Sequence, residues 1–128
     1  MYFDSPGPEY TGETLKIAVE QATKRQISHI VIASNTGATA FTLSEEARRQ
    51  GYKGKLVCVT HVYGFAENGV NELSDESRSD LEKQGVRVHT AAHALTGAER
   101  GLSRKFQGVY PVEMIAHSLR MFGQGMKV

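Results

Sequence analysis

The sequence has 128 residues, a length that suits one domain, and its 15 Lys and Arg against 14 Asp and Glu give a net charge of +1. A chain of this length buries roughly two-thirds of the surface that it exposes when unfolded, so it can form a hydrophobic core. The balanced charge argues against a nucleic-acid binder, and no apolar stretch reaches the roughly 18 residues of a membrane span. The single cysteine, Cys58, excludes an intrachain disulfide and suits a core position in a reducing compartment. We therefore predict a cytoplasmic protein that binds neither nucleic acid nor a membrane.

The first half of the chain predicts a helix, a strand and a second helix. Residues 12–25 carry apolar side chains at helical spacing after Thr11, which we expect to be the N-cap. The run HIVIAS, residues 29–34, is apolar and β-branched without alternation, which predicts a central strand covered on both faces by helices. A helix over residues 38–50 follows, and Gly51 is placed to end it in the left-handed conformation.

The next segments repeat this alternation. KLVCVT, residues 55–60, predicts a second buried strand. A long irregular segment, roughly residues 61–73, is long enough to be functional. Ser74 then predicts the N-cap of a helix that ends before Gly85, and VRVHT, residues 86–90, predicts a third strand.

The last part of the chain predicts two more helices. One covers residues 98–104, and another begins at Pro111 with an apolar face made by Val112, Ile115, Leu119 and Phe122. The tail GQGMKV, residues 123–128, predicts the start of a further extended run. Strands that alternate with helices predict an α/β fold with right-handed crossovers and an open, mostly parallel sheet.

A cluster of small hydroxylic residues follows the first strand, in the turn Ser34–Asn35–Thr36–Gly37–Ala38–Thr39. In a parallel sheet this turn lies at the carboxyl edge, where ligands bind and where backbone N–H groups of the next helix point outward. A glycine allows close approach of an anion, hydroxyls can donate hydrogen bonds, and the helix dipole favours negative charge. The turn therefore predicts a phosphate site. The alternative is structural: Thr36 or Asn35 only caps the helix and Gly37 only serves the turn.

Other motifs limit the chemistry. The sequence has neither GxGxxG nor a Walker lysine, so we do not expect a dinucleotide site or an ATPase. Thr60 and His61 close the second strand, while Thr90 and His93 follow VRVH, residues 86–89. These groups could meet at one sheet edge, although a histidine after a strand is more often structural. No spacing links the histidines into a metal site, and no base is identifiable for a nucleophile such as Ser34 or Cys58. We predict no metal and name no catalytic residue.

The segment LTGAERGLSRKFQG, residues 95–108, concentrates basic side chains between glycines. The guanidinium groups of Arg100 and Arg104 could bind a phosphate or a carboxylate, or stack on a ring. The alternative is a solvated helix in which Glu99 pairs with a neighbouring basic side chain.

Four motifs in order carry a resemblance to a known family: YFDSPGPEYTGETL (residues 2–15), SNTGATA (34–40), VTHVYGF (59–65) and TGAERGLSRK (96–105). The strand, SNTGATA and the following helix resemble the phosphate-binding loop of the pyruvate kinase carboxyl-terminal domain. The chain as a whole resembles the stand-alone, archaeal and bacterial proteins built on that α/β domain. The motifs span nearly all of residues 2–127.

The resemblance implies a three-layer α/β/α domain without the kinase barrel, and so without pyruvate kinase activity. It also implies flavin mononucleotide (FMN) as the ligand, with its phosphate at the turn and the rest of the pocket formed by the following loop and helix. The implied binding residues are Ser34, Asn35, Thr36, Gly37, Ala38, Thr39, Thr60, His61, Gly64, Phe65, Glu99, Arg100, Ser103 and Arg104.

The resemblance implies a further strand and helix beyond FGQGMKV, which this sequence does not contain. We therefore expect residues 1–128 to be one domain without that segment, completed by homo-oligomerisation or by a separate carboxyl-terminal chain. Three functions stay open at this stage. The chain is an FMN-binding protein with or without catalysis, a regulatory sensor of a sugar phosphate, or an assembly subunit in which the turn is only a helix cap.

Overall fold

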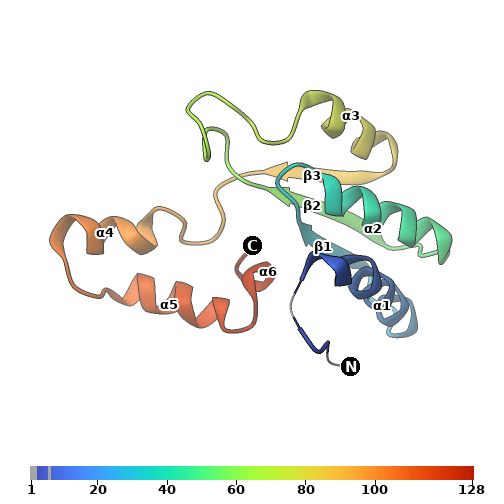
Figure 1. Ribbon diagram of the computed structural model, residues 1–128, viewed down its shortest axis with the longest axis horizontal. Helices are drawn as coiled ribbons and strands as arrows, with labels where there is room; N and C mark the ends of the chain where they lie inside the picture. Colours follow the sequence, from blue (N-terminus) through green and yellow to red (C-terminus); the bar gives the residue numbers. More distant parts are fainter. Residues whose placement is uncertain (1–2, 6) are drawn as a thin grey trace. The chain divides into compact units, whose positions relative to one another are not determined.

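The computed structural model describes residues 3–5 and 7–128. Tyr2 and Pro6 of the amino-terminal motif lie outside the described residues. The chain divides into two compact units, and each is described by itself (Figure 1). Unit 1 comprises Met1–Thr60 and Glu72–His89, and unit 2 comprises His61–Asn71 and Thr90–Val128.

Unit 1 contains a three-stranded parallel sheet in the order β1-β2-β3, formed by β1 (His29–Ala33), β2 (Lys55–Thr60) and β3 (Val86–Thr90), whose last residue is assigned to unit 2. β1 and β2 are paired in register from His29 with Lys55 to Ala33 with Val59. The predicted α/β fold with an open parallel sheet flanked by helices is therefore confirmed.

The predicted central position of the first strand is wrong, because β1 lies at an edge of the described sheet and β2 lies at its centre. Exposure also alternates along β1, and Val31 is 59% exposed. An apolar run specifies a strand, but its neighbours are specified by residues elsewhere in the chain, so the run alone did not give the position.

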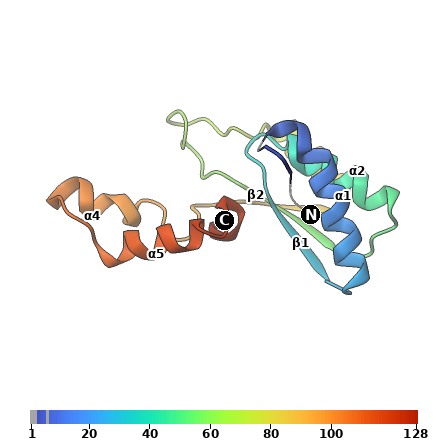
Figure 2. The ribbon, with the colours of Figure 1, turned by 60° about the horizontal axis from the view of Figure 1, so that its bottom comes forward.

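Three α-helices complete unit 1: α1 (Thr11–Lys24), α2 (Ala38–Arg49) and α3 (Asp75–Lys83). α1 and α2 pack against each other and contact β1 from the same side (Figure 2), while α3 contacts α2. The predicted N-cap of the first helix is wrong by one residue, because the short 3₁₀ helix η1 (Pro8–Tyr10) leads directly into α1 and makes Tyr10 the N-cap.

The core of unit 1 lies between these helices and the sheet. The stripes predicted for α1 and α2 are buried as expected, with Val19 and Leu43 fully buried. The buried cluster comprises Leu15, Val19, Ala40, Leu43, Ala47, Leu56, Cys58, Leu73, Leu81 and Val86. The helix ends also follow the prediction, since Gly51 and Gly85 adopt positive φ angles of 67° and 84°.

Unit 2 contains a loop over residues 61–71 and the helices α4 (Ala98–Phe106), α5 (Pro111–Arg120) and α6 (Gln124–Lys127). α4 and α5 pack side by side, and α6 packs on α5 (Figure 1). None of the described helices is both long enough and apolar enough to cross a membrane.

The helix predicted from Pro111 is present as α5, but it ends at Arg120, before Phe122. On its predicted apolar face Ile115 is exposed, and the buried residue of this helix is Ala116. The prediction for the tail is wrong, because the tail does not begin an extended run. Gly123 turns the chain with a φ of 100°, the N–H of Met126 donates to the Gly123 carbonyl oxygen at 3.1 Å, and α6 forms instead.

Candidate functional site

The turn Ser34–Thr39 joins the carboxyl end of β1 to the start of α2. Ser34 is buried, and its backbone is anchored to the neighbouring strand. Its N–H donates to the Val59 carbonyl oxygen at 3.0 Å, and its own carbonyl oxygen accepts the Cys58 thiol at 3.6 Å. Thr36 and Ala38, in contrast, are exposed. The turn therefore has a fixed base and an accessible outer side.

Gly37 is the N-cap of α2 and has a φ of 90°, a conformation that side chains other than glycine rarely adopt. A Cβ atom at this position would lie 3.0 Å from Leu73 Cδ1 and 3.3 Å from Leu81 Cδ1. A glycine is therefore required both by the backbone conformation and by the close approach of two core leucines.

The structural alternative for Asn35 and Thr36 is not supported, because Gly37 is the N-cap and no side chain caps α2. α3 shows the contrast: the Ser74 hydroxyl oxygen accepts the N–H of Ser77 at 3.1 Å. α2 also has no acidic residue in its first turn, whereas α1 and α3 do. The positive end of the α2 dipole is thus left without a capping or acidic side chain from its own helix.

The hydroxyl groups of the turn differ in their surroundings. Within residues 3–5 and 7–128, the side chains of Asn35, Thr36 and Thr39 make no hydrogen bond. Thr60, at the end of β2, is fully buried with its interactions inside the protein. The donors that can reach a ligand are therefore those of the turn itself.

Sequence reasoning missed Arg78 of α3 as a charge that acts on Cys58, the residue beneath this turn. Burial raises the pKa of the Cys58 thiol, and the positive charge of Arg78 acts in the opposite direction. The Cys58 sulfur in turn contacts the Ser34 carbonyl oxygen. Arg78 also forms an ion pair with Glu82 at 3.7 Å. No local motif marks Arg78, because it lies far along the chain from the turn.

The loop residues predicted for the ligand pocket lie in unit 2. The rings of His61 and Phe65 are in contact, with a centroid separation of 3.9 Å and a tilt of 35° between their planes. Gly64 has a φ of 75°, and its N–H donates to the Val70 carbonyl oxygen at 2.9 Å. These contacts fold the loop back on itself and hold the imidazole of His61 beside the aromatic ring.

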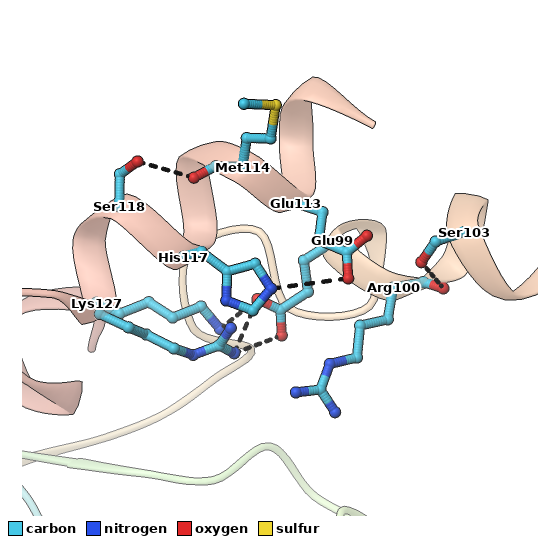
Figure 3. Close-up of polar contacts among 9 residues, drawn as sticks. Glu99, Arg100, Ser103, Glu113, Met114, His117, Ser118 and Lys127 are labelled. Carbon is cyan, nitrogen blue, oxygen red and sulfur yellow. Dashed lines mark hydrogen bonds and ion pairs between the residues drawn. The ribbon is translucent and has the colours of Figure 1, made fainter. Parts of the chain in front are cut away.

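The helix α4 contributes the other predicted residues (Figure 3). Arg100 and Arg104 are exposed, and the Ser103 hydroxyl donates to the Arg100 carbonyl oxygen at 3.2 Å. Glu99 is 6% exposed, and its carboxylate accepts hydrogen bonds from Arg120 at 2.8 and 2.9 Å. Lys127 Nζ lies 3.1 Å from Glu99 Oε2. Glu99 is thus paired, but inside the unit with partners from α5 and α6 rather than on a solvated helix face.

The environment of Glu99 has two opposing effects on the pKa of its carboxyl group. Burial alone would raise the pKa of the carboxyl group, whereas the hydrogen bonds and charges of Lys127 and Arg120 lower it. The second effect prevails, and the pKa of Glu99 lies below its ordinary value of 4.5. Glu99 is therefore ionised at neutral pH and acts as the acceptor for both cations.

A cavity of about 90 Å³ lies in unit 2 beside this cluster, lined by His61, Val62, Phe65, Ala91, Ala92, His93, Thr96, Glu99, Arg120 and Lys127. The structure thus brings three predicted residues, His61, Phe65 and Glu99, to one cavity. Arg100, Ser103 and Arg104 do not line it. No local motif marks Arg120 or Lys127 as partners of Glu99, because both lie on other helices.

The fourteen predicted residues therefore fall into two groups. The turn and Thr60 belong to unit 1, while the loop residues and the four residues of α4 belong to unit 2. A family model, described as pyruvate kinase, alpha/beta domain, matches residues 13–128 of the chain. This match covers most of the chain, including the sheet, the turn and the helices of unit 2. The chain belongs to the pyruvate kinase alpha/beta domain family.

Proposed function

We propose that this chain binds a phosphate-bearing small molecule at the turn Ser34–Thr39, with FMN as the first ligand to test and without pyruvate kinase activity. The observation that carries the proposal is the start of α2. Its N-cap is a glycine in the left-handed conformation, and its first turn has neither a side-chain cap nor an acidic residue. An anion placed there would accept hydrogen bonds from backbone N–H groups of α2 and would interact favourably with the helix dipole.

The hydroxyl groups of the turn support a phosphate group in particular. The hydroxyls of Thr36 and Thr39 can donate hydrogen bonds to phosphate oxygens, and in the described part of the chain they make none. The hydrogen-bond donors of the proposed site therefore come from the turn and from the start of α2.

The flavin ring of the ligand rests on the resemblance to the stand-alone family and not on the geometry of the turn. A sugar phosphate sensed without turnover would use the same turn but would not need an aromatic partner.

A comparison of FMN with riboflavin tests the phosphate anchor, because the two ligands differ only in the phosphate group. We expect the full chain to quench FMN fluorescence with an affinity at least tenfold higher than that for riboflavin, which corresponds to about 1.4 kcal/mol. Equal affinities would overturn the phosphate anchor. A chain that binds neither flavin, but is stabilised against heat by a sugar phosphate, would support the sensor and remove FMN.

Ala38→Asp is the sharpest variant for this site. Ala38 is exposed and is the first residue of α2, so a carboxylate there repels a phosphate while it favours the helix dipole. We expect at least a tenfold loss of FMN affinity without loss of thermal stability. The matched control is Ala98→Asp, the same change at the first residue of α4 after another glycine N-cap, in unit 2. Equal losses in both variants would contradict binding at the turn.

A further inference from the structure

Glu99, Arg120 and Lys127 form an ion cluster that joins three helices of unit 2. Figure 3 shows Glu99 and Lys127 of this cluster. The side chain of Lys127 is 2% exposed and that of Glu99 is 8% exposed. Arg120 donates to both carboxylate oxygens of Glu99, and Lys127 Nζ also donates to the Thr96 hydroxyl oxygen at 3.2 Å. The cluster therefore holds two cations on one carboxylate.

The charges that line the adjoining cavity are unequal. Arg120 and Lys127 contribute two positive charges and Glu99 contributes one negative charge, so these three groups leave an excess of one positive charge. Burying a lysine is costly unless nearby negative charge compensates it. An anion in the cavity would place a second negative charge beside Lys127, whose ammonium group is buried against Glu99.

The cavity also has the size and the hydrogen-bonding groups that an oxyanion needs. Its volume of about 90 Å³ compares with the roughly 10–15 Å³ that one water requires by the same kind of measure. Several oxygen atoms therefore fit. The rings of His61 and His93, with centroids 5.6 Å apart, and the Thr96 hydroxyl line the same cavity and are groups that can donate to oxygen.

We propose that this cavity binds a small oxyanion, either a phosphate or a carboxylate group, held by Arg120 and Lys127 with Glu99 as the internal counter-charge. The site is made entirely of residues of unit 2, whereas the turn Ser34–Thr39 belongs to unit 1. The proposal is therefore independent of the function proposed for the turn, and each can fail without the other.

The test follows the imidazole signals of His61 and His93 by NMR in the full chain. Inorganic phosphate and acetate are added in separate titrations, at fixed pH and with ionic strength matched by chloride. We expect saturable shifts of both rings with at least one of the two anions. Tighter binding of phosphate assigns a phosphate group to the site, and tighter binding of acetate assigns a carboxylate. Shifts that do not saturate with either anion would overturn the proposal.

Two variants with opposite expected effects separate binding from structure. Lys127→Met keeps the length of the side chain, leaves Glu99 paired with Arg120, and removes the excess charge, so we expect at least a tenfold loss of affinity. Lys105→Met is the matched control, because it removes the same charge from an exposed lysine of α4. We expect its affinity to stay within twofold of the wild type.

Glu99→Gln raises the positive charge beside the cavity and should tighten binding of the anion at least threefold. If the cluster is purely structural, the anion-dependent shifts of the imidazole rings should be lost in both Lys127→Met and Glu99→Gln. That result would overturn the proposal. If Glu99→Gln does not fold, the pair Lys127→Met and Lys105→Met still decides: equal affinities in the two would contradict the site. Ring shifts that persist in Ala38→Asp would support a site separate from the turn, and their loss there would contradict it.

Discussion

Gly37 shows how one residue serves both the fold and the candidate site. It gives the backbone a positive φ and leaves room for Leu73 and Leu81, while its position starts the helix whose first turn belongs to the proposed phosphate site. The sequence predicted the turn from its glycine and hydroxyl groups. It did not predict the contacts with the two leucines, because these lie more than thirty residues further along the chain.

Gly37→Ala should therefore reduce the free energy of unfolding, by about 1–3 kcal/mol for the strained backbone alone. The contact at 3.0 Å with Leu73 adds to this cost. Urea unfolding gives the measurement. The control is Gly12→Ala in α1, where a Cβ meets nothing within 4 Å and φ is not positive. That variant should gain rather than lose stability, and a Gly37→Ala protein as stable as the wild type would contradict the role of this glycine.

Cys58 should be almost inert in the native protein. Its side chain is fully buried, and burial raises the pKa of the thiol, so little thiolate is present at neutral pH. We expect a thiol reagent to modify Cys58 at least a hundredfold more slowly in the folded protein than in urea. Because Cys58 is the only cysteine, the reaction reports this site alone. Comparable rates in both conditions would mean that the sheet opens readily around β2.

Glu99 predicts a pH dependence of stability with a defined sign. Its pKa is lowered in the folded protein, so its ion pairs stabilise the fold fully above the ordinary value of 4.5 and lose this effect as the pH falls below it. The difference in unfolding free energy between the wild type and Glu99→Gln should therefore shrink as the pH falls from 6 toward 3. Urea unfolding at a series of pH values measures it. A difference that is constant over this range would show that Arg120 and Lys127 do not lower the pKa of Glu99.

At the scale of the elements, local signals predicted most helices and strands. Glycines at helix ends, the Ser74 cap and Pro111 at the start of α5 mark boundaries through groups that lie within a few residues. The position of β1 and the exposure of α5 depend on which other elements lie beside them. Those neighbours are specified by distant residues, and an apolar pattern in one segment does not identify them.

Ser74→Ala tests the best-defined boundary. It removes the hydroxyl oxygen that accepts the N–H of Ser77, so we expect a loss of about 1 kcal/mol in the free energy of unfolding. Ser79→Ala is the control, because Ser79 is an exposed residue inside the same helix. Alanine has the higher helix propensity there, so this variant should be neutral or slightly stabilised. Equal losses in the two variants would contradict the cap.

At the scale of the whole molecule, the sequence predicted the fold class but not the division into two units. Each unit is assembled from two separate segments of the chain, so no single linker rich in proline or glycine marks the boundary. The same division separates the predicted ligand residues into two groups. Motifs are read along the chain, so they do not indicate which of the two units a predicted site residue belongs to.

Self-association, expected from the sequence, stays a prediction at this scale. Several large apolar side chains of unit 2 are exposed, among them Val109, Met121 and Phe122 at 74%, 84% and 77%. Exposed apolar side chains of this size favour contact with another molecule. We expect sedimentation velocity to show larger species as the protein concentration rises, and Phe122→Gln to shift the distribution toward the monomer. A monomer at every concentration would contradict the expectation.

The leucine pair beneath Gly37 would link the binding of a ligand at the turn to the stability of unit 1. Leu73 and Leu81 are core residues, and both lie within van der Waals distance of the Cβ position that Gly37 lacks. The turn Ser34–Thr39 is thus in direct contact with the core at Gly37. By thermodynamic linkage, a ligand held at the turn and lost on unfolding would raise the melting temperature of the unit. Volume changes at position 81 would then tune affinity from the inside, without any contact with the ligand.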